Sequence, residues 1–158
     1  KYLLPQRIGA RTAMYAKGKS FVEDRSPVED QSIFWRRFHQ QGYLTNEQLQ
    51  ELQKAATEGY AGKPKSDVII TLLRSPEECS KLILRRGRPE EIRAWAIPEL
   101  RAMEKLYQEF FEDLEQYGSH RGPKIILDMK VLDPRNEVHK GHIFQEIHHS
   151  LLKERGNT

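Results

Sequence analysis

The sequence predicts an α/β protein in which a parallel sheet is flanked by helices. Three short apolar runs rich in β-branched residues indicate buried strands, at residues 20–23, 67–73 and 124–129. Longer segments with helical spacing separate these runs, and such alternation is typical of parallel sheets covered on both faces. The chain has 158 residues, 37% of them apolar and 31% charged, so we expect residues 1–158 to form a single domain.

Local start and stop signals place the first two predicted helices. Residues 31–41 have helical spacing, and Gly42 follows them. Thr45 with Gln48 forms a capping-box pattern, which predicts a helix of roughly a dozen residues after it.

The second half of the chain carries three more helix signals. Ser75 is a good N-cap, Pro76 suits the first helical position, and Gly87 marks the end of that helix. Two further helices are expected at about residues 98–117 and 137–153.

Composition limits the class of protein. Cys79 is the single cysteine, so no internal disulfide can form, and we expect the cytoplasm or the mitochondrial matrix as the compartment. No apolar run approaches the ~18 residues that span a bilayer, so no transmembrane segment is expected. The net charge is +3, but 26 basic residues are interleaved with 23 acidic ones, which argues against a nucleic-acid-binding stripe.

The first predicted strand ends in polar residues that can do chemistry. Asp24 and Arg25 follow it directly, and ligands of parallel sheets bind at the carboxyl ends of strands. A carboxylate there can serve a metal-bound phosphate, and a guanidinium can hold a hydroxyl nucleophile. The alternative is a structural Asp–Arg ion pair at a strand-to-helix turn. A second cluster, LRRGR at residues 84–88, suits one phosphorylated small molecule.

Two motifs resemble the deoxynucleoside kinases. DRSPVED at residues 24–30 is similar to the segment in which an acid-Arg-Ser triplet closes a strand of that family. SPEECSKLILRRGRPEE at residues 75–91 is similar to the family's helix and lid. The resemblance covers about residues 1–115 and implies a P-loop fold of the nucleoside-monophosphate-kinase type, with a deoxynucleoside and ATP or another nucleoside triphosphate as substrates, together with Mg²⁺.

The resemblance also implies roles for the residues after the first predicted strand. Asp24 resembles the acid that helps to hold magnesium, and Arg25 resembles the arginine beside the 5′-hydroxyl of the nucleoside. Asp30 resembles the aspartate that helps to read the base. Spacing from Arg25 places Arg7 where the family has a second base-contacting arginine.

The other implied roles belong to the second motif and the last predicted strand. Arg86 and Arg88 resemble the lid arginines that close over the transferred phosphoryl group, and Glu91 resembles the carboxylate that takes the 3′-hydroxyl. Asp128 lies where the family's adenine-holding loop begins, although a simple turn residue is the alternative. Leu82 stands where the family usually has one more arginine.

The phosphate-binding motif G-x-x-x-x-G-K-[ST] does not occur in the sequence. We therefore expect the phosphate loop, its strand and the general base to come from a segment before residue 1. The expected function is phosphorylation of a deoxynucleoside 5′-hydroxyl in nucleoside salvage, by a homodimer. The alternative is a non-catalytic, kinase-like accessory subunit of mitochondrial respiratory complex I, within a larger assembly.

Two other patterns have ordinary explanations. The first is a helix face of His139, His142, Glu146 and His149, which we expect to be solvated, with zinc as the alternative. The second is the aromatic set Tyr107, Phe110, Phe111 and Tyr117, which is typical of a helix core or a dimer seam.

Overall fold

The computed structural model describes residues 3–18, 20–112 and 122–156. These residues form helices and a two-stranded sheet, and the chain divides into two compact units. The first unit comprises residues 1–65 and 106–119, and the second comprises residues 66–105 and 120–158. Within the described ranges, every helix is too short or too polar to span a lipid bilayer.

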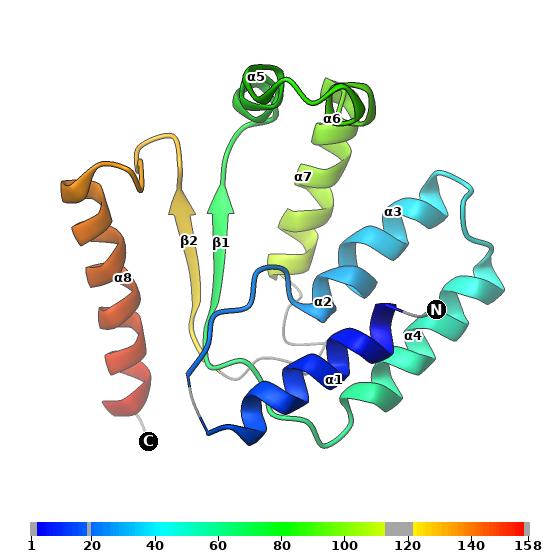
Figure 1. The fold of residues 1–158 in the computed structure, drawn as a ribbon, viewed down its shortest axis with the longest axis horizontal. Coiled ribbons are helices and arrows are strands. Elements are labelled where there is room, and N and C mark those ends of the chain that lie inside the picture. Colours follow the sequence, from blue (N-terminus) through cyan, green and yellow to red (C-terminus); the bar gives the residue numbers. More distant parts are fainter. Residues whose placement is uncertain (1–2, 19, 113–121, 157–158) are drawn as a thin grey trace. The chain divides into compact units, whose positions relative to one another are not determined.

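The first unit is helical. Its elements are α1 (Leu3–Ala16), α2 (Pro27–Glu29), a π-helical segment η1 (Asp30–Phe34), α3 (Trp35–Gln40), α4 (Asn46–Tyr60) and the last part of α7 (Ile97–Glu112). α1 lies beside α4 (Figure 1). Apolar side chains from several of these elements form its core: Leu4, Val28, Ile33, Ala56, Leu106 and Phe110.

The helix predicted at residues 31–41 begins earlier than expected, at Pro27, and includes a π-helical stretch. Its start is stabilised because the Glu29 carboxylate accepts a hydrogen bond from the backbone N–H of Ser26 at 2.6 Å. It ends before Gly42, whose φ of 78° is a conformation that favours glycine.

The capping box predicted before α4 is present. The Thr45 hydroxyl accepts from the backbone N–H of Gln48 at 3.3 Å, and the Gln48 side chain accepts from the backbone N–H of Thr45 at 2.9 Å. These two bonds satisfy donors that the helix itself leaves unpaired. The helix signal at this position is therefore confirmed.

The second unit holds the sheet. β1 (Ile69–Leu73) and β2 (Lys124–Asp128) pair in parallel, with Ile69 opposite Lys124 and Leu73 opposite Asp128. The second and third predicted strands are thus confirmed, each slightly shorter than expected. Ile125 and Leu127 are buried on one face of β2, whereas Ile126 on the other face is 52% exposed.

The helices of the second unit are α5 (Pro76–Arg86), α6 (Pro89–Ala94), the first part of α7, and α8 (Glu137–Gly156), which packs beside β2 (Figure 1). The predicted signals of α5 are confirmed. The Ser75 hydroxyl accepts from the backbone N–H of Glu78 at 3.3 Å, and Gly87 ends the helix with a φ of 73°. Of the predicted helix at residues 98–117, α7 reaches Glu112; Tyr117 lies outside the described residues.

The strand predicted at residues 20–23 is wrong. The structure has an extended but unpaired segment there, and the sheet among the described residues contains β1 and β2. A strand needs the backbone groups of a neighbour, and no described strand pairs with these residues. Side chains hold the segment instead, since the Phe21 ring packs edge-on against the Tyr15 ring of α1 with 5.0 Å between centroids.

Candidate functional site

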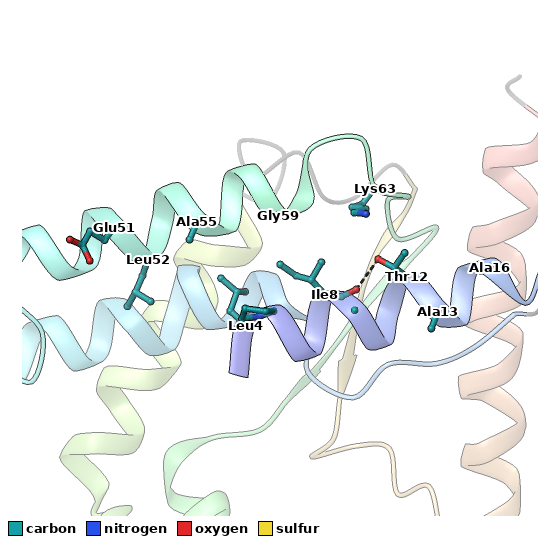
Figure 2. A pocket seen from close by; sticks show the side chains of 12 residues that line it. Leu4, Ile8, Thr12, Ala13, Ala16, Glu51, Leu52, Ala55, Gly59 and Lys63 are labelled. Carbon is teal, nitrogen blue, oxygen red and sulfur yellow. Dashed lines mark hydrogen bonds between the residues drawn. The ribbon is translucent and has the colours of Figure 1, made fainter. Parts of the chain in front are cut away.

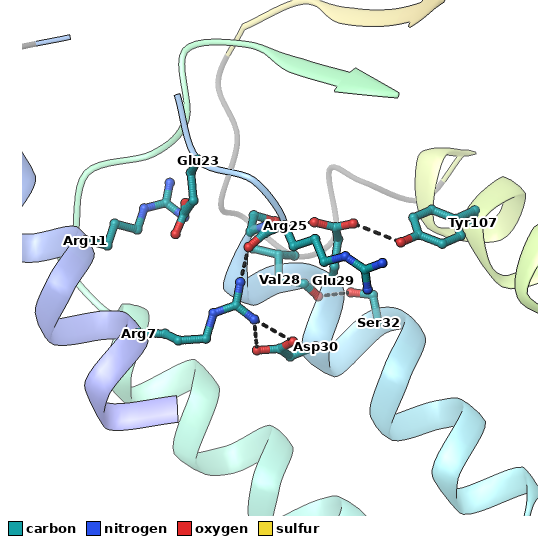
Figure 3. Close-up of polar contacts among 10 residues, drawn as sticks. Arg7, Arg11, Glu23, Arg25, Val28, Glu29, Asp30, Ser32 and Tyr107 are labelled. Atoms are coloured by element: carbon teal, nitrogen blue, oxygen red, sulfur yellow. Dashed lines mark hydrogen bonds and ion pairs between the residues drawn. The ribbon is translucent and has the colours of Figure 1, made fainter. Parts of the chain in front are cut away.

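Two of the predicted base-reading residues form an ion pair in the first unit. One guanidinium nitrogen of Arg7, on α1, donates to both carboxylate oxygens of Asp30, at 2.8 and 2.7 Å (Figure 3). The side chains are 29% and 20% exposed, so the pair is half-buried but reachable from solvent. The predicted pairing of Arg7 with Asp30 is therefore present in the structure.

The π-helical segment η1 places the Asp30 carboxylate. Asp30 is its first residue, and the fully buried Ser32 donates its hydroxyl to the carbonyl oxygen of Val28 at 2.8 Å. Hydrogen bonds of this kind distort a helix, and π-helical turns occur frequently at functional sites. The local distortion at Asp30 is thus a second feature, beside the ion pair, that indicates a site here.

Arg25 lies next to this pair in an unusual conformation. Its φ is 61°, which is uncommon for a residue other than glycine and persists only where surrounding contacts impose it. The structure shows two such contacts. A second nitrogen of Arg7 donates to the carbonyl oxygen of Arg25 (Figure 3), and the Arg25 guanidinium lies 5.0 Å from the centroid of the Phe34 ring.

A second ion pair lies one helical turn further along α1. Arg11 is 6% exposed, and its guanidinium lies 3.5 Å from the carboxylate of Glu23. The same guanidinium lies over the Tyr15 ring, 5.7 Å from its centroid, and donates to the Tyr15 hydroxyl at 3.4 Å. Arg7 and Arg11 thus both contact the segment of residues 23–25 (Figure 3).

Burial governs the carboxyl groups of this region. It raises the pKa of Glu23 and of Asp30, and in both cases a neighbouring arginine opposes the shift without cancelling it. Burial also raises the pKa of Glu29, although its carboxylate accepts from the Ser26 backbone and from the Tyr107 hydroxyl, the latter at 3.2 Å. The cluster is therefore a partly buried, charged environment, in which the polar groups of a ligand would interact strongly with these side chains.

The hydroxyl of Tyr60, at the end of α4, is buried and has no hydrogen-bond partner among the described residues. Burial raises its pKa, so the hydroxyl stays protonated and able to donate. Arg11 and Asp30 are among the charged groups that act on it. A buried donor without a partner can bind a polar atom of a ligand.

An apolar groove of about 800 Å³ runs between α1 and α4 (Figure 2), and its lining includes neither Arg7 nor Arg11. Its lining from α1 includes Leu4, Ile8 and Thr12, and its charged residues are Glu51 and Lys63. The groove and the polar cluster are therefore lined by different residues.

The predicted lid residues form their own cluster in the second unit. Arg86 donates to one oxygen of the Glu91 carboxylate at 2.9 Å, and Arg88 donates to the other at 2.8 Å. These hydrogen bonds, first from Arg88 and then from Arg86, lower the pKa of Glu91. Both arginines are more than half exposed, so their charges can reach an anion in solvent.

The comparison with protein families gave one match, in which the deoxynucleoside kinase model covers residues 1–153. The chain belongs to the deoxynucleoside kinase family. Searches of curated proteins and of solved structures gave no match. Membership in the family confirms the resemblance drawn from DRSPVED and from the lid motif, and it implies a P-loop kinase fold.

The magnesium of deoxynucleoside kinases needs hard oxygen ligands. Asp24 offers an exposed carboxylate beside Arg25. In the part of the chain that the structure describes, no three His, Cys, Asp or Glu side chains are grouped to hold a metal ion. Proteins commonly bind magnesium through one or two carboxylates together with substrate phosphates and water, so a carboxylate such as that of Asp24 has the right chemistry for one ligand.

Two other predicted positions have structural contacts. The Asp128 carboxylate accepts from the backbone N–H of Lys130 at 2.8 Å, which makes it the first residue of a turn after β2. Arg74, directly after β1, donates to the carbonyl oxygen of Met129 at 2.8 Å. His139, on the face considered for zinc, accepts from the backbone N–H of Asp133 at 3.1 Å.

The sequence analysis missed several members of the polar cluster around Arg7 and Asp30 in the first unit. It did not predict α1, Arg11, Glu23 or the bond between Glu29 and Tyr107. The spacing of Arg7 and Arg11, four residues apart, was the available signal for α1, because such residues share a helix face. No pattern in the sequence links Arg11 with Glu23 or Glu29 with Tyr107, since those pairs form through packing.

Proposed function

We propose that this protein phosphorylates the 5′-hydroxyl of a deoxynucleoside, with ATP or another nucleoside triphosphate as the donor. The observation that supports this most directly is the half-buried pair of Arg7 and Asp30 beside the strained Arg25. A guanidinium and a carboxylate together present donors and acceptors in fixed positions, as the edge of a nucleobase requires. Family membership supplies the reaction class.

Four charged residues of the first unit have proposed roles in this reaction. Arg7 and Asp30 read the base, with the carboxylate accepting from an exocyclic amine. Arg25 holds the 5′-hydroxyl side of the sugar, because its side chain projects from the same short segment that contacts Arg7 (Figure 3). Asp24 is the proposed magnesium ligand, and a bound magnesium ion would neutralise charge on the phosphates of the donor.

In the proposed reaction the 5′-oxygen forms a bond to the γ-phosphorus. The bond from that phosphorus to the β,γ-bridging oxygen breaks, the nucleoside diphosphate leaves, and the hydroxyl proton passes to a carboxylate base. Positive charge stabilises this transition state, which is the role we propose for Arg86 and Arg88. Glu91 is proposed to receive the 3′-hydroxyl, and Asp128 to contribute to the donor's adenine pocket. We also propose that the whole chain belongs to one kinase domain.

Product analysis tests the reaction. The full-length protein is incubated with ATP, Mg²⁺ and each deoxynucleoside, and mass spectrometry identifies the product. We expect a 5′-monophosphate from at least one deoxynucleoside and no product from its 5′-deoxy analogue. Hydrolysis of ATP without transfer to any nucleoside would contradict the proposal.

A further inference from the structure

The segment of residues 23–25 has no sheet to support it among the described residues, yet it carries Asp24 and Arg25. Sheet hydrogen bonds normally fix such a segment, and here the described strands pair elsewhere. Its backbone is also strained at Arg25, with a φ of 61°. Among the described residues, side chains rather than a ladder of hydrogen bonds support this conformation.

Two arginines of α1 provide that support. Arg7 donates to the carbonyl oxygen of Arg25, and Arg11 pairs with the side chain of Glu23 at 3.5 Å. The two arginines are one helical turn apart, so their guanidinium groups lie along one face of α1. They contact Arg25 and Glu23, the residues on the two sides of Asp24 in the sequence.

The Arg11–Glu23 pair is well fixed on the α1 side. Arg11 is 6% exposed and is held by the ring and the hydroxyl of Tyr15. Tyr15 in turn contacts Phe21 and donates to the carbonyl oxygen of Lys65 at 3.1 Å. Glu23 is therefore paired with a buried side chain that Tyr15 also contacts.

Stability alone does not explain this pair. The side chains of Arg11 and Glu23 are only 6% and 26% exposed, so removing these charged groups from water has a cost. A largely buried ion pair commonly contributes little net stability, because desolvation offsets the Coulomb attraction. What such a pair does supply is a defined geometry for the chain on each side of it.

We propose that Arg11 and Glu23 are positioning residues for phosphoryl transfer, which fix residues 23–25 on α1 and so place Arg25 and Asp24 beside the Arg7–Asp30 pair. The inference rests on the proposed function for its catalytic consequence. Arg7 keeps its own contact with Asp30 when Glu23 is altered, so base binding should persist. The 5′-hydroxyl, in contrast, should lose its correct placement. A displacement of a reacting group by about 1 Å can lower a rate by ~10²-fold.

The sequence provides a probe of this segment that does not need activity. Trypsin cleaves after Arg25, because serine and not proline follows it. Cleavage requires the segment to leave its folded position, so the rate reports how often the segment is released. Cleavage after Arg135, in an exposed turn of the second unit, serves as the internal control.

The main test uses Glu23→Gln in the full-length protein. We expect cleavage after Arg25 to accelerate several-fold with cleavage after Arg135 unchanged. We expect kcat to fall ~10-fold or more, while the Kd for the deoxynucleoside stays within about threefold. An unchanged cleavage rate after Arg25, or an unchanged kcat in an active enzyme, would overturn the proposal.

Two variants of Arg11 separate positioning from folding. Arg11→Lys keeps the charge and should retain most of kcat, whereas Arg11→Met should behave like Glu23→Gln. Equal losses in both variants would overturn the role of the ion pair, as would a general increase in cleavage at both sites. If the wild type transfers no phosphate, the proposed function fails, and cleavage after Arg25 alone decides whether the segment is held by this pair.

Discussion

One nitrogen of Arg7 contacts both carboxylate oxygens of Asp30, and the two residues are 23 positions apart in the chain. The pair lies at the start of a π-helical segment and is only partly exposed. Burying a charged pair in this setting has a desolvation cost, and hydrogen bonds to a polar ligand can offset part of that cost. Its geometry is the centre of the proposed base-reading site.

Replacing Asp30 with asparagine tests the acceptor role. Asp30→Asn keeps the shape of the side chain but removes its charge, so a charge-assisted hydrogen bond to the base amine is weakened. Such a bond contributes about 1.5–3 kcal/mol, so we expect kcat/KM to fall roughly 10- to 100-fold for the preferred deoxynucleoside. Asp133→Asn is the matched control, since Asp133 pairs with the exposed Arg135 in the second unit. Equal effects of the two variants would argue against the assignment.

The lid arginines are expected to act mainly in the transition state. Arg86→Ala and Arg88→Ala should each lower kcat by ~10²-fold or more and leave deoxynucleoside binding largely intact. Arg101→Ala is the control, because Arg101 forms an exposed ion pair with Glu77 that lies outside the LRRGR cluster. Steady-state kinetics with isothermal titration of the nucleoside measure both quantities. Unchanged turnover in the two lid variants would remove their assignment.

The buried Glu29 predicts a pH dependence of stability. Its folded-state pKa is raised above the ordinary value of 4.5, so the unfolded chain releases this proton at a lower pH than the folded protein does. Stability therefore falls as the pH rises above about 4.5 through the raised pKa. We expect the free energy of unfolding of the wild type, relative to Glu29→Gln, to decline over this range in urea titrations.

The opposite slope would contradict the burial of Glu29. Glu90→Gln is the control for this measurement, because Glu90 lies exposed in the first turn of α6. The decline of wild type relative to Glu29→Gln should persist when Glu90→Gln is present in both proteins.

Local signals predicted the elements whose ends are determined by neighbouring residues. Thr45 and Gln48 opened α4 as expected, and Ser75 and Gly87 bounded α5, because caps involve residues close in sequence. Residues 20–23 were wrongly predicted as a strand. Their β-type composition is compatible with an extended chain, but a strand also depends on a partner that composition does not reveal.

The residues of the candidate site also divide into those that the sequence predicted and those that only packing brings together. Arg7 and Asp30 were named from a family motif and from spacing, and the structure brings them together. Arg11 and Glu23 were missed because their pairing depends on how residues 20–25 return along α1, which is a consequence of packing. The π-helical turn at Asp30 was also missed, since residues 30–34 have ordinary helical spacing.

The most direct test of the central claim is a comparison of kcat/KM for the four deoxynucleosides with the full-length protein. The Asp30 carboxylate can accept from the exocyclic amine of adenine, guanine or cytosine, whereas thymine lacks that amine and adds a methyl group. We predict that deoxyadenosine, deoxyguanosine or deoxycytidine is preferred over thymidine by at least ~10-fold. A clear preference for thymidine would contradict the role of Arg7 and Asp30, and phosphorylation of none of the four would instead favour the non-catalytic accessory role.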